Sequence, residues 1–289
     1  MTTFPDASLV SPASEVADDV RLVCIDIDGT LVGSSGHVHP SIWRAAARVR
    51  DAGIRIAVCS GRPALGVAVD FAARLDTTGW HSFQNGASVL NLGSGETRSQ
   101  YLPLDAVAAL VERARGSTYP LELYTDTAYA IESTADRARE HAALLGVPFE
   151  PQSFESLHGP VVRAQWMVSL PEVDAVLAMP SFGLEVATST SPVMPGTVFV
   201  GMTPPGVNKS VAVRAIAAEY GVSLPHVMFV GDGGNDVAAM TIVGTAVAMA
   251  NAEPETRAVA SHLAGHVDDA GLVDALELAL AMARRPGRD

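Results

Sequence analysis

Three short segments of the chain are almost continuously apolar and do not alternate between apolar and polar residues. They span residues 21–27 (RLVCIDI), 54–59 (IRIAVC) and 226–231 (HVMFVG), and each runs into a polar or glycine-rich turn. Such runs predict strands that are buried on both faces, as in a parallel sheet covered by helices. This pattern limits the chain to an α/β fold in which the strands are joined by helical crossovers.

The segment between the first two runs predicts one of these crossover helices. Ile42, Ala46 and Val49 follow helical spacing, Ser41 stands where an N-terminal cap is expected, and Gly53 ends the pattern. The same order returns near the C-terminus, where a striped helix over 209–221 precedes the strand at 226–231. Both ends of the chain therefore belong to one doubly wound layer.

The middle of the chain has a different pattern. Residues 121–133 and 163–171 alternate like strands open on one face, while 104–116 and 136–146 have helical periodicity. We therefore predict a Rossmann-like doubly wound parallel sheet with an inserted α+β domain. The predicted boundaries are a flexible leader at 1–20, a discontinuous core at 21–86 and 203–289, and the inserted domain at 87–202. The crossings lie in the Gly-, Pro- and Asn-rich stretches QNGAS (84–88) and MTPPGVNKS (202–210).

Composition excludes several classes of function. The 289 residues carry a formal net charge of −13, which disfavours nucleic acid or an anionic membrane as a partner. No apolar run reaches the length of a membrane helix, and the first twenty residues lack the features of a signal peptide, so a cytoplasmic protein is expected. Cys24 and Cys59 lie in buried runs and are expected to be reduced, packed thiols.

Polar residues follow the predicted strands at the edge where ligands bind in open parallel sheets. Four clusters occupy this edge or a neighbouring helix start: Asp26 and Asp28; Ser60, Gly61 and Arg62; Lys209; and Asp232, Asn235 and Asp236. Up to four carboxylates would meet there, opposed by Lys209 and Arg62. Oxygen ligands of this kind suit Mg²⁺, which would also leave one aspartate free to act as a nucleophile.

In order along the chain, DIDGT, CSGR, the lysine of GVNKS, and GDGGND resemble the four motifs of the haloacid dehalogenase (HAD) superfamily of phosphotransferases. The position of the insertion, together with QNGAS and the tail AMANAEPETRAVA, is similar to the Cof-type branch with an α/β type IIB cap. The resemblance covers about residues 21–280. It implies a phosphatase whose inserted domain is a substrate-specificity cap.

The resemblance also implies roles for individual residues. Asp26 would be the nucleophile that forms an aspartyl-phosphate, and Asp28 would protonate the leaving alcohol and then activate water. Mg²⁺ would be held by the Asp26 side chain, the Asp28 backbone carbonyl and Asp232, with Asp236 completing the shell. Ser60 and Lys209 would bind the phosphoryl oxygens and complete the catalytic set.

Further residues are expected around the substrate by the same resemblance. Amides near Gly29 and Gly61 would bind the phosphoryl group, Thr30 would position Asp28, and Asn235 would orient Lys209 or the metal shell. Arg62 starts the next predicted helix and is expected either in the pocket or on the surface. Asn85 is expected either to cap a turn or to contact the substrate. The family more often has threonine or alanine at position 60, and the last cap strand, TVFVGM, lacks the glutamate often found there.

Simpler interpretations are available for several residues. The DIDG stretch is not an EF-hand, because it follows a strand and lacks the glutamate at the twelfth position of the loop. His37 and His39 are expected to face solvent and make a poor zinc site. Glu122 and Asp126 alternate with Tyr124 on a predicted cap strand; they are expected on a solvated face, with the cleft as the alternative. Aromatic and methionine side chains are expected to pack the interior of the inserted domain, namely Tyr124, Tyr129, Trp166 and Met167.

The sequence therefore predicts a Mg²⁺-dependent phosphatase acting on a small phosphorylated metabolite such as a sugar phosphate. A phosphomutase would carry identical motifs and would form a phosphorylated isomer in place of free phosphate. A non-catalytic metabolite-binding regulator is the third alternative, although it would have no need for the paired carboxylates of Asp26 and Asp28. The sequence makes no prediction of oligomeric state.

Overall fold

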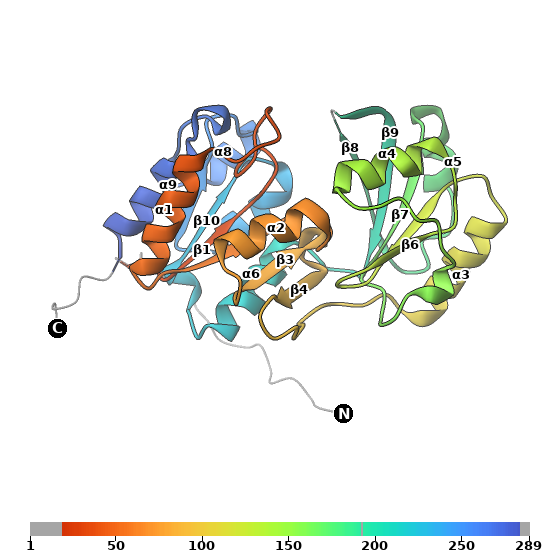
Figure 1. The fold of residues 1–289 in the computed structure, drawn as a ribbon, viewed down its shortest axis with the longest axis horizontal. Helices are drawn as coiled ribbons and strands as arrows, with labels where there is room; N and C mark the ends of the chain where they lie inside the picture. The colour runs from red at the N-terminus through yellow and green to blue at the C-terminus, as the bar shows by residue number, and fades with distance from the viewer. Residues whose placement is uncertain (1–18, 192, 284–289) are drawn as a thin grey trace.

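The chain forms two five-stranded sheets, each covered by helices, and the two lie side by side along the long axis of the molecule (Figure 1). The computed structural model describes residues 19–191 and 193–283. The predicted leader, residues 1–20, lies outside the described residues except for Asp19 and Val20. Among the described helices, none is both long enough and apolar enough to span a membrane.

The first sheet is parallel, with strand order β12-β11-β10-β1-β2. Its strands are β1 (Leu22–Ile25), β2 (Arg55–Val58), β10 (Val227–Gly231), β11 (Thr245–Ala248) and β12 (His262–Leu263). In β1, Val23 and Ile25 join the apolar cluster on one face, while Leu22 and Cys24 join the cluster on the other. The near-continuous apolar run therefore follows from burial on both sides of the strand.

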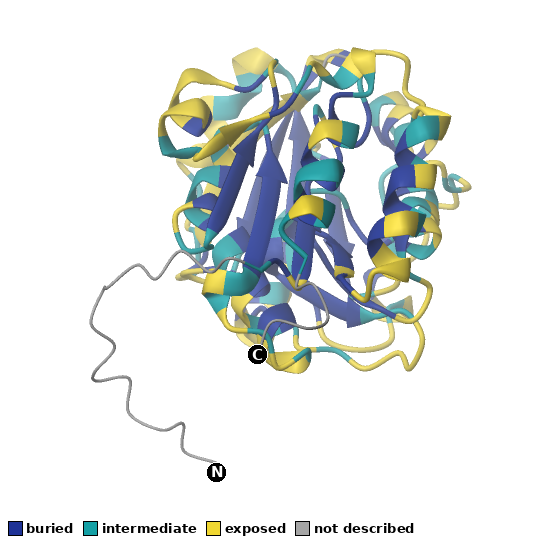
Figure 2. Ribbon diagram, turned by 90° about the vertical axis from the view of Figure 1, so that its left-hand side faces the viewer, coloured by how far each residue is buried: buried dark blue, intermediate teal, exposed yellow. Residues whose placement is uncertain are grey.

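Helices cover both faces of this sheet. One face carries α1 (Pro40–Asp51), α2 (Gly66–Leu75) and α9 (Leu272–Ala281); the other carries α6 (Lys209–Glu219), α7 (Val237–Met240) and α8 (Pro254–Val259). Figure 2 shows the strands of this end of the molecule as a buried layer between partly exposed helices. The predicted doubly wound parallel sheet is confirmed.

A hairpin, β3 (Trp80–Phe83) and β4 (Ser88–Asn91), extends the first sheet and leads towards the second. Its link to the strand before it is a single parallel bridge between Cys59 and Ser82. The hairpin turn, Gln84–Gly86, lies at the predicted first crossing, but the chain does not leave the core there. Val89 and Leu90 of β4 pack into the two apolar clusters of the first sheet, so the crossing to the second sheet follows β4.

The second sheet is antiparallel, with order β6-β5-β7-β9-β8. Its strands are β5 (Leu121–Tyr124), β6 (Tyr129–Ile131), β7 (Arg163–Val168), β8 (Glu185–Ser191) and β9 (Met194–Thr203). Helices α3 (Leu104–Arg115) and α5 (Val173–Leu177) pack on one face, and α4 (Asp136–Leu145) packs on the other. The inserted α+β architecture is thus as predicted.

Two local expectations are wrong. Strand β5 is buried at every position, so Glu122 is fully buried and does not lie on a solvated face. The cap of α1 is His39 and not Ser41, because the helix begins at Pro40, two residues earlier than a Ser41 cap predicts; the His39 side chain accepts a hydrogen bond from the Ser41 amide. His37 and His39 are both exposed, as expected.

His81 ties β3 to β2 and has no exposed surface. Its Nδ1 accepts a hydrogen bond from the Val58 amide at 3.1 Å, and its Nε2 lies 2.8 Å from the Asp76 carbonyl oxygen. Accepting at Nδ1 requires the neutral ring. Burial accordingly lowers the pKa of His81 to about 4.

We therefore expect the protein to lose stability as the pH falls from 6.5 to 4, because in this window the unfolded chain binds a proton at position 81 and the folded chain does not. The loss attributable to this histidine is about 3 kcal/mol. Urea unfolding across this pH range would show a shallower decline for His81→Gln than for the exposed-site control His158→Gln. Equal declines in the two variants would contradict the assignment.

Candidate active site

Lys209, the first residue of α6, lies at the centre of the predicted site and has no exposed surface. Its Nζ donates to Asp26 Oδ1 and to Asp236 Oδ1, at 2.6 Å each. Asp26 directly follows β1, and Asp236 ends the turn after β10. Asp26 and Asp236 lie 183 and 27 positions from Lys209 in the sequence, and the fold brings all three to one point at the carboxyl edge of the sheet.

The turn after β10 is shaped around the Asp236 carboxylate. Asp236 Oδ2 accepts hydrogen bonds from the amides of Asp232 and Gly233, at 3.0 and 3.1 Å. A Cβ atom on Gly231 would lie 2.4 Å from the same oxygen, so only glycine fits beside it. Both oxygens of Asp236 are engaged by protein groups, which makes this residue an organiser of the turn.

Oxygen atoms of Asp26, Asp232 and Asp236 lie within 4.8 Å of one another. Burial, followed by the nearby Asp236 carboxylate, raises the pKa of Asp232 to about 6. Burial also raises the pKa of Asp26, against the opposing effect of Lys209. Lys209 alone therefore does not balance the three carboxylates, and the group could bind a cation.

The turn after Asp26 is tight. The Ile27 carbonyl accepts hydrogen bonds from the amides of Thr30, Leu31 and Val32, which folds the chain back at Gly29. Gly29 has φ +81°, and a Cβ there would lie 2.0 Å from Asp232 Oδ2. Position 29 therefore needs glycine for both backbone and packing reasons.

Thr30 does not position Asp28 as expected. Its hydroxyl donates to Asp232 Oδ1 at 3.0 Å, linking the first motif to the last. Asn251, which sequence analysis did not assign to the site, does the same from the turn after β11: its Nδ2 donates to the Gly29 carbonyl at 2.8 Å and to Asp232 Oδ2 at 3.3 Å. The available signal for Asn251 was its position within AMANAEPETRAVA, the tail that forms part of the family resemblance.

Asp28 lies apart from the three clustered carboxylates, and its side chain is 60% exposed. Arg62 holds it with two hydrogen bonds, Nε to Oδ2 at 2.9 Å and Nη2 to Oδ1 at 2.6 Å. These hydrogen bonds raise the pKa of Arg62. Helix α2 starts at Gly66, so Arg62 belongs to the turn before the helix, and its charge faces the site.

The loop after β2 and the hairpin turn contact each other. Ser60 is buried, and its Oγ accepts from the Arg62 amide at 3.1 Å. The Asn85 amide donates to the Ser60 carbonyl, and Asn85 Oδ1 accepts from Asn235 Nδ2 at 3.0 Å. Asn235 was expected to orient Lys209 or the metal shell, but the structure pairs it with Asn85 at the edge of the site.

Gly61 completes this contact. An added Cβ would lie 3.0 Å from Asn85 Oδ1, so the small residue lets the hairpin turn approach the loop. The structure therefore groups the predicted site residues into two neighbouring sets. The inner set is Asp26, Thr30, Lys209, Asp232 and Asp236, and the outer set is Asp28, Ser60, Gly61, Arg62, Asn85 and Asn235.

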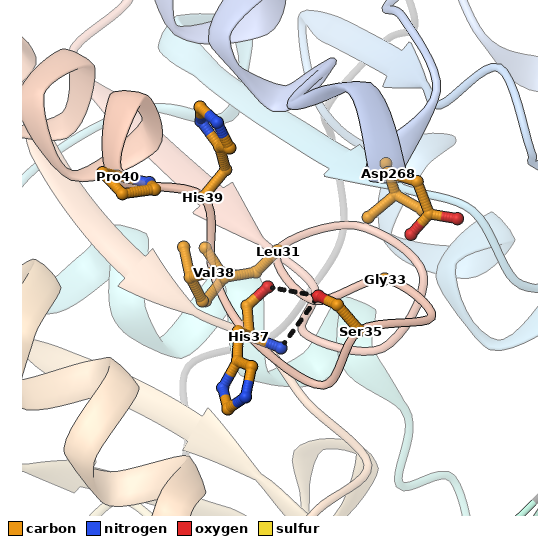
Figure 3. A pocket seen from close by; sticks show the side chains of 9 residues that line it. Leu31, Gly33, Ser35, His37, Val38, His39, Pro40 and Asp268 are labelled. Carbon is orange, nitrogen blue, oxygen red and sulfur yellow. Dashed lines mark hydrogen bonds between the residues drawn. The ribbon is translucent and has the colours of Figure 1, made fainter.

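A separate hollow of about 190 Å³ lies beside the loop that follows the first motif (Figure 3). Its lining includes Leu31, Val38 and Asp268, and Ser35 Oγ bridges the backbone amide and carbonyl of His37. The three clustered carboxylates are not among its lining residues. We therefore place the candidate active site at the carboxylates and not in this hollow.

Comparison with known proteins identifies the fold and the family. A family model for haloacid dehalogenase-like hydrolases matches residues 23–276. The 5-amino-6-(5-phospho-D-ribitylamino)uracil phosphatase YbjI of Escherichia coli K12 is 24% identical over 268 residues, which cover 90% of this chain and 96% of that protein.

Solved structures agree over similar lengths. A haloacid dehalogenase-like hydrolase of Bacteroides thetaiotaomicron has a TM-score of 0.78 at 24% identity, covering 90% of this chain and 99% of that one. The HAD subclass IIB sugar phosphatase BT4131 has a TM-score of 0.73 at 22% identity, covering 91% and 100%. The chain therefore belongs to the haloacid dehalogenase-like hydrolases, as a phosphoric monoester hydrolase with the subclass IIB architecture.

Proposed function

We propose that this protein is a Mg²⁺-dependent phosphatase that hydrolyses a small phosphorylated metabolite through an aspartyl-phosphate on Asp26. The observation that carries the proposal is the buried Lys209 ammonium between Asp26 and Asp236, with Asp232 alongside. This group combines a carboxylate nucleophile, a fixed positive charge and an unbalanced set of oxygen ligands in one place. Phosphoryl transfer requires these three elements.

We also propose a division of labour along the chain. Residues 21–91 and 203–289 would form the core that performs the chemistry, since Val89 and Leu90 of β4 pack against the first sheet, and residues 92–202 would form the cap that selects the substrate. The separate antiparallel sheet of β5 to β9 and its own apolar cluster support this division.

The three clustered carboxylates fit a divalent cation by their chemistry. They are hard oxygen donors, and the pKa values of Asp26 and Asp232 are raised by burial and by neighbouring carboxylates, as expected where like charges lack a counter-ion. Asp26 and Asp232 would hold Mg²⁺ with the Asp28 backbone carbonyl, and Asp236 would complete the shell directly or through water. When bound, Mg²⁺ neutralises charge on the transferring phosphoryl group.

Asp26 would begin the reaction. Lys209 holds its Oδ1, which fixes the direction of the carboxylate beneath the incoming ester. A carboxylate oxygen attacks phosphorus, and the bond from phosphorus to the ester oxygen breaks. Asp28 gives its proton to the departing alkoxide, so an alcohol leaves and the phosphoryl group stays on Asp26.

Asp28 would also complete the reaction. Its exposed carboxylate takes a proton from a water molecule, which attacks phosphorus, releases inorganic phosphate and restores Asp26. The two hydrogen bonds from Arg62 fix the carboxylate at the edge of the site, where both alcohol and water can reach it. Ser60, the Gly61 amide and Lys209 would bind the phosphoryl oxygens during both steps.

Two relatives support a phosphorylated sugar or polyol as the substrate class. YbjI is named for a phosphorylated ribityl compound, and BT4131 is described as a sugar phosphatase. We propose that the same class is the substrate here. A turnover screen over phosphorylated sugars, polyols, cofactors and nucleotides, scored as free phosphate, would test it and would also reveal a mutase, which releases none.

Asp26→Asn should lower Mg²⁺-dependent phosphate release by about three orders of magnitude or more, because an amide is a poor nucleophile. The fold should persist, since the amide keeps an oxygen that can accept from Lys209 and removes one of the crowded carboxylates. Phosphate release and thermal melting measured on the same preparation would check both points. Hydrolysis at the wild-type rate would show that Asp26 is not the nucleophile.

Asp28→Asn should slow an alkyl phosphate more than p-nitrophenyl phosphate, because the nitrophenolate leaves without needing a proton. The phosphoenzyme should then accumulate with p-nitrophenyl phosphate, since water activation is also lost. Rapid-quench measurement of protein-bound phosphate would detect this. Equal slowing of both substrates, with no bound phosphate, would argue against the acid and base roles of Asp28.

Mg²⁺ should raise the melting temperature of the wild-type protein, and Asp232→Asn should remove most of this increase. A ligand at about a hundred times its Kd stabilises the folded state by about 2.7 kcal/mol. Since protons compete for Asp232, whose pKa is about 6, the increase should shrink as the pH falls from 8 to 5. An equal increase in Asp232→Asn would place the metal elsewhere.

A further inference from the structure

Arg163, at the start of the cap strand β7, reaches across to the core. Its Nη1 donates to the Gly61 carbonyl at 3.2 Å and to Gln84 Oε1 at 3.1 Å. Gly61 follows Ser60 in the loop proposed to bind phosphate, and Gln84 opens the hairpin turn that contacts this loop. A single guanidinium of the cap therefore contacts two neighbouring segments of the active-site edge.

A series of hydrogen-bonded polar side chains within the cap fixes this guanidinium. Arg163 Nη2 donates to Gln165 Oε1, and Gln165 Nε2 donates to Glu122 Oε2 at 3.1 Å. Glu122 is fully buried and also accepts from the Tyr124 hydroxyl at 2.5 Å and contacts His141 Nδ1 at 2.9 Å. The carboxylate that was expected on a solvated face is thus the anchor of a network that points to the core.

The cap sheet leaves a space for the guanidinium. A Cβ atom at Gly201 of β9 would lie 2.9 Å from Arg163 Nη2 and 3.1 Å from its Nε. The backbone of Gly201 is not in the left-handed region, so this glycine is explained by the arginine and not by a turn. By contrast, a Cβ at Gly196 on the same strand would meet no atom within 4 Å.

The turn that receives Arg163 is strained. Gln84 and Asn85 both have φ of 55°, an unfavourable value for residues with side chains. Gln84 is 1% exposed, and its Nε2 has no hydrogen-bond partner among the described residues. Strain and an unpaired buried donor persist where surrounding contacts impose them, and here Arg163 engages the other end of the same amide.

The strained turn controls the loop beside it. The Gln84 amide donates to the Arg62 carbonyl, and the Asn85 amide donates to the Ser60 carbonyl. Together with the bond from Arg163 to Gly61, these contacts fix three consecutive carbonyls of the loop at residues 60–62. The two bonds from Arg163 exist only while the cap lies against the core.

We propose that Arg163 is a positioning residue of the phosphatase, which fixes the phosphate-binding loop through Gly61 and Gln84 when the cap is closed. The proposal rests on the function proposed above. It makes cap closure a condition for a well-ordered phosphate site, so the substrate is enclosed before the chemistry becomes fast. Arg163 acts through the loop and touches neither phosphorus nor the leaving group in this role.

Arg163→Gln should lower kcat by about tenfold or more, the size expected for losing hydrogen bonds from a charged donor. KM should change less than kcat, because the loop is needed most in the transition state. Arg163→Lys keeps the charge but cannot span both acceptors as the guanidinium does, so it should recover little of the loss. Full recovery by lysine would show that charge alone matters and would overturn the positioning role.

Gly201→Ala tests the same contact without altering a polar group. The added methyl group should displace the guanidinium and reproduce the fall in kcat, whereas Gly196→Ala, the matched control, should keep wild-type kinetics. A double-mutant cycle of Arg163→Gln with Gln84→Ala should be non-additive in kcat, because each variant breaks the same bond. Wild-type kcat in Gly201→Ala, or an additive cycle, would overturn the proposal.

Hydrogen exchange provides a readout that does not depend on activity. In Arg163→Gln the amides of Gln84 and Asn85 should exchange faster, while those of β10 in the core should be unchanged. If the wild-type protein hydrolyses no phosphate ester but this exchange pattern is found, the proposed function fails and the contact stands. If the wild-type protein is active but exchange and kcat are unchanged in the variant, the positioning role fails and the function stands.

Discussion

One buried ammonium group determines how the active site is assembled. Lys209 has no exposed surface, and its ion pairs with Asp26 and Asp236 join β1, α6 and the turn after β10. Removing the lysine would leave these two buried carboxylates without a counter-charge, which is far more costly than the net value of the intact pairs. The nearby carboxylates raise the pKa of Lys209 against the effect of burial, so the ammonium stays charged.

Glycines make this arrangement sterically possible. Gly29 and Gly231 stand where a side chain would overlap the carboxylates of Asp232 and Asp236. These close approaches let backbone amides and carboxylates of two distant motifs share one small volume. The glycine-rich turns therefore affect the electrostatics of the site, because they determine how close together the carboxylates can lie.

The sequence was sufficient for the fold class and for the residues of the inner set. Continuous apolar runs identify strands buried on both faces, and polar residues at their ends must meet because parallel strands share one carboxyl edge. Side-chain partners beyond that edge were not predictable. Thr30 contacts Asp232 and not Asp28, and Asn251 reaches the site from the turn after β11. Such partners depend on side-chain directions, which hydrophobic periodicity does not predict.

The largest error concerned Glu122, and its cause is physical. A glutamate that alternates with apolar residues normally marks an exposed face, since burying a carboxylate is costly unless it is well hydrogen-bonded. Here tyrosine, histidine and glutamine side chains supply those bonds, and they come from three different elements of the cap. Tyr124 is close in the sequence, but His141 and Gln165 lie 19 and 43 residues from Glu122, so most of this compensation exists only in the assembled cap.

The turn of the β3–β4 hairpin meets the crossing by which the chain returns from the inserted segment to the core. A Cβ atom at Gly86, in this turn, would lie 2.3 Å from the carbonyl oxygen of Asn208 in the crossing. Asn208 caps α6 by accepting from the Ser210 amide, and the next residue is Lys209. An exchange of the inserted segment for one from a relative is therefore constrained at its return junction: a graft that keeps Asn208 in register against Gly86 preserves the position of the lysine, whereas one extra residue at this junction would shift the start of α6 and separate the ion pairs.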